Sequence, residues 1–228
     1  MTRILALDTS TDACSVALMD GQSVREDFRI EPRRHTHLLL PMVDALLAES
    51  GIRVQDLDAI AFGRGPGSFA GIRIATGAAQ GLALAADLPL IPVSTLSALA
   101  LDATDRYPEA IVLAALDARM DEVYWSVCAR KGDGIQVLQA EAVSPPSVIR
   151  LNEFEQTLVA VGSGLRYLQQ MHSASIKQFQ TVDSECYPHA ASMLRLAAID
   201  LQAGSTLAPE DAQPVYLRDQ VAWKKRDQ

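Results

Sequence analysis

The segment ILALDTSTDACSVAL, residues 4–18, has the pattern of two strands joined by a polar turn. A short apolar run ends at Asp8, and apolar residues resume at Ala13. The same arrangement returns at IVLAALDARMDEVYWSV, residues 111–127, where Asp117 ends the apolar run. In both copies another Asp follows four residues later. Since a repeated unit of this kind fixes the architecture of a chain, we expect two similar halves.

The order of elements around the two copies also indicates duplication. Each copy begins with three meandering strands, and the hairpin turns at 20–21 and 131–134 contain glycine. Alternating helices and strands follow. We therefore predict an α/β fold of two domains, each with a mixed sheet and flanking helices. The predicted N-terminal domain covers residues 1–103, completed by 205–220, and the C-terminal domain covers 104–204.

Composition excludes several classes of protein. The 228 residues are 49% hydrophobic, which suits a folded core and not a disordered chain. A net charge of -8 argues against a stand-alone nucleic-acid binder. Three scattered cysteines give neither a disulfide framework nor a zinc cluster. The first apolar run reaches Asp8 too early for a signal peptide, and we see no run of about 18 apolar residues, so we expect a cytoplasmic protein without a membrane span.

The duplicated strand–turn–strand resembles that of actin, the chaperone ATPases and the sugar kinases, which implies an actin-like fold. In that superfamily the two hairpins grip nucleotide phosphates in an interdomain cleft. Such a grip requires glycine, because backbone N–H groups must approach the phosphates closely. The turns 8–11 and 117–120 contain no glycine, and Arg119 and Met120 are bulky. The sequence therefore argues against nucleotide binding.

A second glycine-rich segment, GRGPGSFAGIRI, spans residues 63–74 and opens a predicted helix. Gly65, Gly67 and Ala70 match a dinucleotide-binding pattern, but the segment does not follow the first strand. One interpretation is an anion site at the helix N-terminus with Ser68 as N-cap. The other, which we favour, is a tight turn that sets the helix angle. No histidine pair has metal-ligand spacing, so we expect no metal and no cofactor.

The helix predicted over 36–49 is apolar around more of its circumference than a core helix needs. Its apolar residues spread over roughly 200°, about twice the stripe required for core packing. The helix predicted over 69–86 is rich in glycine and alanine, which permits another helix to approach closely. We therefore predict a partner interface, with self-association of the free chain as a further possibility; the alternative is that the chain itself covers both faces. The predicted interface residues are Leu39, Leu40, Met42, Val43, Leu46, Leu47, Ile72, Ala75 and Ala79.

Several segments closely resemble the TsaB family. They are Leu7-Asp8-Thr9-Ser10, His35-Thr36 with Leu39-Leu40-Pro41, residues 63–74, and the tail Pro214-Val215-Tyr216-Leu217-Arg218 with Val221-Ala222-Trp223-Lys224. The resemblance implies a non-catalytic scaffold beside a catalytic paralogue, which transfers a threonylcarbamoyl group to the adenosine following the tRNA anticodon. It further implies pairing through the first two helices, a small ATPase subunit as a further partner, and only indirect contact with tRNA.

The resemblance also implies that catalytic metal ligands are missing. In the paralogue two histidines spaced His-x-x-x-His bind the metal, and Thr95 and Leu99 stand at the matching positions here. Neither side chain replaces an imidazole. The rival hypothesis is a cleft-based hydrolase or a nucleotide-binding enzyme. Its candidate cleft residues are Asp8, Ser10, Gly65, Gly67 and Asp117.

Overall fold

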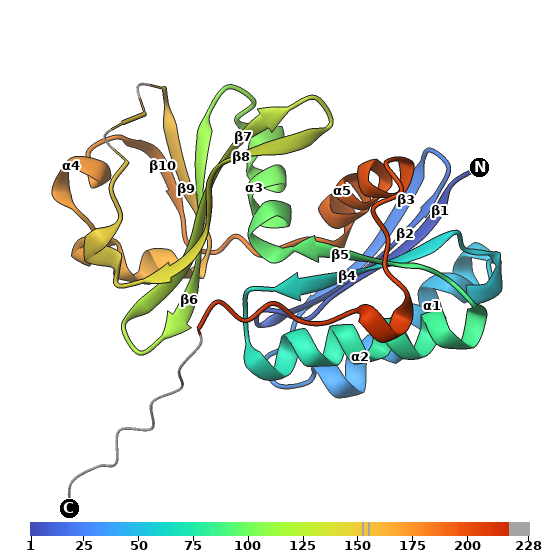
Figure 1. Ribbon diagram of the computed structural model, residues 1–228. Coiled ribbons are helices and arrows are strands. Elements are labelled where there is room, and N and C mark those ends of the chain that lie inside the picture. The colour runs from blue at the N-terminus through green and yellow to red at the C-terminus, as the bar shows by residue number, and fades with distance from the viewer. Residues whose placement is uncertain (152, 155, 219–228) are drawn as a thin grey trace, which may run out of the picture.

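Two five-stranded mixed sheets form the centre of the protein (Figure 1). The computed structural model describes residues 1–151, 153–154 and 156–218. The first sheet has the order β3-β2-β1-β4-β5 and the second the order β8-β7-β6-β9-β10. The strands of the first sheet are β1 (Arg3–Asp8), β2 (Ala13–Asp20), β3 (Ser23–Ile30), β4 (Ala59–Gly65) and β5 (Leu90–Ser94). Those of the second are β6 (Ile111–Arg119), β7 (Glu122–Lys131), β8 (Gly134–Ser144), β9 (Leu158–Val161) and β10 (Phe179–Asp183).

The predicted duplication is present in the topology. In each sheet the first strand pairs antiparallel with the second and parallel with the fourth. The α/β fold class predicted from sequence is therefore confirmed. One strand, β10, was not predicted, because it is only five residues long and its side chains alternate between half-buried and exposed without a strong apolar face.

Helices cover both faces of the first sheet (Figure 1). Helices α1 (His35–Ser50) and α2 (Phe69–Ala86) pack on one face, and α5 (Ala190–Gln202) packs on the other. Helix α3 (Thr95–Arg106) lies between the sheets, and the short α4 (Ser173–Ile176) flanks the second sheet. The predicted N-cap Ser68 accepts a bond from the Gly71 amide at 3.4 Å. Gly51 ends α1 in the left-handed conformation, where glycine carries no steric penalty.

Two helices cross between the halves of the chain. The apolar side of α3, which lies mainly within 1–103, belongs to the core of the second sheet. Conversely, α5 comes from 104–204 but packs against β1 and β2 of the first sheet. The chain therefore does not divide into helices and sheets at one point, because each of these two helices packs on the sheet formed by the other half. The tail returns to the first domain, where Leu207 and Leu90 exchange backbone bonds of 2.8 and 2.9 Å.

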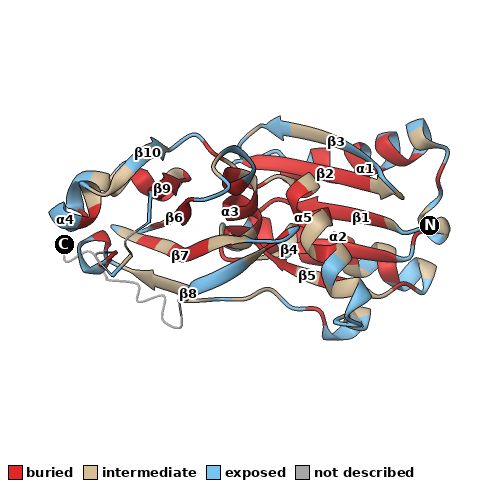
Figure 2. Cartoon of the chain, turned by 90° about the horizontal axis from the view of Figure 1, so that it is seen from above, coloured by how far each residue is buried: buried red, intermediate tan, exposed pale blue. Residues whose placement is uncertain are grey.

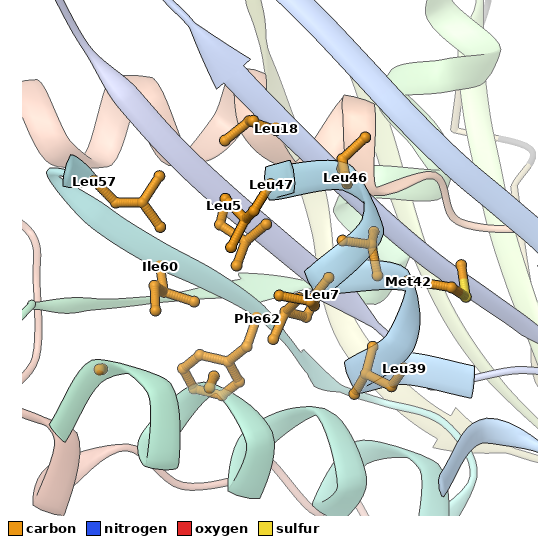
Figure 3. Close-up of a cluster of buried hydrophobic side chains, with 14 of the residues drawn as sticks. Leu5, Leu7, Leu18, Leu39, Met42, Leu46, Leu47, Leu57, Ile60 and Phe62 are labelled. Carbon is orange, nitrogen blue, oxygen red and sulfur yellow. The ribbon is translucent and has the colours of Figure 1, made fainter. Parts of the chain in front are cut away.

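The buried core follows the central strands of both sheets, while the edge strand β3 is exposed or half-buried and the edge strand β8 is mostly half-buried (Figure 2). On one face of the first sheet, side chains from α1 meet those of β1 and β4 (Figure 3). Leu39, Met42 and Leu46 each retain 5% exposure or less. Burying such a side chain contributes about 1.5–3 kcal/mol, so α1 is a structural part of the domain.

This burial corrects the predicted partner interface. Eight of the nine side chains named for it are covered by the chain itself, so the prediction that they form an exposed face is wrong. The helical wheel misled because α1 packs against both β2 and α2, and two neighbours require a wider apolar arc than one. Leu40 is the exception, at 52% exposure. The eight are Leu39, Met42, Val43, Leu46, Leu47, Ile72, Ala75 and Ala79.

Helix α2 has an unusual balance of hydropathy and exposure. Its 18 residues have a mean hydropathy of 1.2, enough by length and composition to cross a membrane, although no such segment was expected from the sequence. This is weak evidence for a membrane span, because the core helices of globular domains pass the same test, and α2 packs against β4. One third of its residues are buried, and seven of the 18 are exposed. An apolar helix therefore leaves one side exposed outside the fold.

Two leucines of α1 test this assignment. We predict that Leu46→Ala lowers the free energy of unfolding by about 2–5 kcal/mol, because it opens a cavity in the core. The matched control Leu40→Ala removes an exposed side chain and should change it by no more than about 0.5 kcal/mol. Urea denaturation followed by circular dichroism measures both values. Equal losses for the two variants would show that the burial of α1 is assigned incorrectly.

Candidate functional site

A cavity of about 530 Å³ lies between the two domains. It is bounded by the β1–β2 turn, the start of α2, the end of β6 and the loop that follows β10. Three predicted cleft residues, Ser10, Gly67 and Asp117, line it; Asp8 and Gly65 do not. Its full lining is Ser10, Thr11, Asp12, Gly67, Ser68, Leu116, Asp117, Ala118, Arg119, Tyr124, Ser163, Leu165, Arg166, Ser184, Glu185 and Tyr187.

The carboxylate of Asp117 is already occupied by protein donors. Arg119 and Arg166 each place Nη1 at 3.1 Å from Asp117 Oδ2. Oδ1 accepts bonds from the Arg119 amide at 2.8 Å and from the Tyr167 hydroxyl at 3.3 Å. A carboxylate with both oxygens bonded in this way is poorly placed to bind a metal or to accept a substrate proton.

The β6–β7 turn narrows the same side of the cavity. Arg119, Met120 and Asp121 have φ values of 62°, 57° and 59°, a conformation that costs residues other than glycine about 1–2 kcal/mol each. Arg218 holds this turn through Glu122 and through the Arg119 carbonyl, at 3.4 Å from the latter. The turn therefore presents side chains where a phosphate-binding hairpin presents glycine N–H groups.

The glycine-rich segment packs against the other hairpin. A Cβ on Gly71 would lie 1.9 Å from the Thr9 carbonyl oxygen, and one on Gly67 would lie 2.4 Å from that of Ser10. The Ser68 amide donates to the Ser10 carbonyl at 2.7 Å. These glycines therefore allow contact with the chain itself, which favours the tight-turn interpretation. A Cβ on Gly65 would also point into the chain, 3.1 Å from the Val215 carbonyl oxygen.

Asp8 is buried beneath the β1–β2 turn. Its Oδ1 accepts bonds from the Ser10 amide at 3.0 Å and the Ser10 hydroxyl at 2.8 Å. Oδ2 has no partner among the described residues and faces Gly63. Burial raises the pKa of Asp8 to about 6, although the two bonds from Ser10 lower it. Asp8 thus acts as a turn-stabilising group inside the domain and is not a cleft ligand.

The positions that match the paralogue's metal ligands are also closed. Thr95 and Leu99 are both fully buried. Leu99 packs in the core of the second sheet, with Cδ2 only 2.7 Å from where a Cβ on Gly162 would stand. Within the described parts of the chain, no three His, Cys, Asp or Glu side chains gather as metal ligands.

Several residues that shape the cavity or join the domains were not predicted from the sequence. Arg166, Tyr124 and Tyr187 line the cavity but belong to no recognisable motif. Arg64 on β4 pairs with Glu141 on β8 at 3.1 Å and so joins the two sheets. Such pairs depend on tertiary contacts between distant segments, for which a single sequence carries no spacing signal.

The buried Asp8 carboxyl predicts a dependence of stability on pH. A native pKa above the unfolded value means that the native state binds more protons, so stability falls as pH rises from about 4 through 6. We expect a loss on the order of 2–3 kcal/mol across this window, at 1.36 kcal/mol per pKa unit. Asp8→Asn, which keeps the acceptor for Ser10, should remove this component when urea denaturation is repeated from pH 4 to 8. A variant with the wild-type slope, or a carboxyl that titrates near 4 by NMR, would contradict it.

Known proteins similar to this chain identify its family. The family model TsaD, described as tRNA N6-adenosine threonylcarbamoyltransferase, matches residues 29–226. The tRNA threonylcarbamoyladenosine biosynthesis protein TsaB of Escherichia coli K12 is 45% identical over 98% of this chain and 97% of its own length. The protein of the same name from Haemophilus influenzae Rd is 39% identical over 97% and 96%.

A solved structure shows the same fold. YeaZ from Pseudomonas aeruginosa superposes with a TM-score of 0.90 at 41% identity, covering 95% of this chain and all of that one. Near-complete coverage in sequence and in structure leaves no large part of the chain unmatched. The chain therefore belongs to the TsaB family.

Proposed function

We propose that this chain is a non-catalytic subunit in the formation of threonylcarbamoyladenosine in tRNA, and that it binds the catalytic transferase paralogue through α1 and α2. The relatives named TsaB carry that pathway in their names, and the matching family model is that of the transferase itself. Two chains of the same fold can pair through the same surface on each, as the subunits of a symmetric dimer do.

The observation that carries the proposal is an exposed apolar surface on α1 and α2. We call it the outer helical face. Leu40 and Leu84 are 52% and 74% exposed there. Exposed apolar side chains that gather on one surface mark a site of protein interaction. The face consists of Leu40, Pro41, Ala45 and Ala48 of α1 with Phe69, Arg73, Gly77, Gly81 and Leu84 of α2.

Two glycines make this face suitable for close helix packing. A Cβ built on Gly77 or Gly81 would meet no atom within 4 Å, so neither glycine is needed for packing inside the chain. Glycine inside a helix costs about 1 kcal/mol relative to alanine. A helix from a partner can approach such a surface closely, and this gain offsets the cost.

The cavity supports the non-catalytic part of the proposal. Asp117 is held by two arginines, the other lining acids, Asp12 and Glu185, are exposed to solvent, and no His, Cys or Lys of the described residues lines the cavity. The net charge of -8 fits a subunit that meets tRNA through its partners, with the small ATPase subunit joining the same assembly. We place the activity in the paralogue and the contribution of this chain in supporting it.

The rival function, a cleft-based hydrolase or nucleotide-binding enzyme, rests on the cavity and on the cleft residues that line it, Ser10, Gly67 and Asp117. It predicts that the isolated chain has its own activity or binds ATP with magnesium. Calorimetric titration measures this directly, and we expect no heat of binding. A micromolar dissociation constant for the isolated chain would favour the rival.

The outer helical face is tested by Gly81→Leu. We expect at least tenfold weaker binding to the purified paralogue, because the new side chain separates the helices. The melting temperature should not fall, since the site is open and leucine is the better helix former. Calorimetry and thermal denaturation give the two values. The matched control is Ala174→Leu on the exposed side of α4. Wild-type affinity in Gly81→Leu would exclude this surface as the interface.

Reconstitution tests the function itself. We expect the paralogue, the ATPase subunit and tRNA to form threonylcarbamoyladenosine efficiently only when this chain is added, and Gly81→Leu to lower that rate in proportion to lost binding. Full modification without this chain, measured by mass spectrometry of digested tRNA, would refute the proposed role.

A further inference from the structure

Arg73 is the single charged residue of α2, and it lies on the exposed side of the helix. It stands four residues after Phe69 and four before Gly77, so all three share one row of the outer helical face. Phe69 is 58% exposed and Tyr216, beside it, is 42% exposed. Exposed aromatic residues around one arginine are the composition typical of binding hot spots.

The guanidinium of Arg73 is held in place by its neighbours. Its Cζ lies 3.8 Å from the centroid of the Phe69 ring, and its Nε donates to the Tyr216 hydroxyl at 2.7 Å. Tyr216 is in turn fixed by the adjoining residue, since the Val215 amide donates to the Arg64 carbonyl at 2.8 Å. Because these contacts order the side chain before any partner arrives, binding loses less conformational entropy.

The unpaired N–H donors of Arg73 favour one kind of ligand. Within the described part of the chain, neither Nη1 nor Nη2 of Arg73 has a hydrogen-bond partner or an ion pair. The Tyr216 oxygen accepts from Nε, which leaves its own proton free to donate. Two parallel N–H groups and a nearby O–H match the acceptors of a carboxylate.

We propose that Arg73, stacked on Phe69 and bonded to Tyr216, is a recognition site for a carboxylate on the partner protein that docks on the outer helical face. The inference rests on the proposed pairing surface and names its polar specificity determinant. The occupant is a helix that carries an Asp or Glu beside apolar residues. A nucleic acid fits less well, because the adjoining Gly77, Gly81 and Leu84 offer nothing to a phosphate backbone.

The identity of the partner is constrained by the charges of this chain. In a second copy, the exposed acids of α1 are Asp44 and Glu49, and Asp44, one helical turn from Leu40 and from Ala48, borders the outer helical face. If self-association used the site, Asp44→Lys would weaken it as much as Arg73→Glu. We assign the carboxylate to the paralogue, so Asp44→Lys should leave the affinity for the paralogue within about threefold of wild type.

Charge reversal at Arg73 tests the site. We expect Arg73→Glu to weaken binding to the purified paralogue roughly 30-fold or more, about 2 kcal/mol at 1.4 kcal/mol per tenfold. Lys177→Glu, an exposed change of equal charge on the second domain, should bind as wild type. Replacing single acids on the first two helices of the paralogue by arginine should yield one variant that restores binding to Arg73→Glu.

Tyr216 is a positioning residue, so its effect must pass through Arg73. Tyr216→Phe should weaken binding several-fold in the wild-type chain and have no effect in the Arg73→Ala chain, a coupling that a merely structural role would not produce. Wild-type affinity of Arg73→Glu, or equal effects of Tyr216→Phe in both chains, would overturn the inference. If Arg73→Glu binds normally while Leu84→Asp does not, the surface holds and the carboxylate site fails. If both bind normally, the proposed surface fails as well.

Discussion

The contact between the start of α2 and the β1–β2 turn is the one on which the rest of the structure depends. Gly67 and Gly71 bring two backbones so close that any side chain there would overlap the Thr9 or Ser10 carbonyl. The Thr9 hydroxyl donates to the Gly71 carbonyl at 2.6 Å and fastens the contact. One arrangement thus has two results: the glycines are used inside the chain and not for a ligand, and the opposite side of α2 is turned outward.

The sequence predicted the architecture better than it predicted surfaces. Strand order and duplication follow from Asp8 and Asp117 at the ends of matching strands, and the limits of α2 follow from Ser68 and the apolar run after it. The fifth strand of the second sheet had a weak local pattern, although the duplication itself requires it. The exchange of α3 and α5 between domains has no sequence signal, because it depends on which sheet a helix meets after folding.

The predicted interface failed for a physical reason that also indicates how to correct it. A helical wheel counts apolar residues but cannot tell whether one neighbour or two will cover them. Leu46 and Leu47 are buried in the core. Gly77 and Gly81, which a helical wheel does not count as apolar, lie at the surface with open space beside them. Among the cleft candidates, Ser10, Gly67 and Asp117 line the cavity. Asp8 does not, because its direction depends on strand pleat and on the turn it supports.

We propose that this chain acts through its outer helical face and that its cleft binds no ligand. Hydrogen–deuterium exchange of the chain with and without the paralogue measures both regions at once. We predict slowed exchange over residues 36–48 and 69–85, with the turns at 8–12 and 117–121 unchanged. Protection of those turns without protection of the two helices would contradict it.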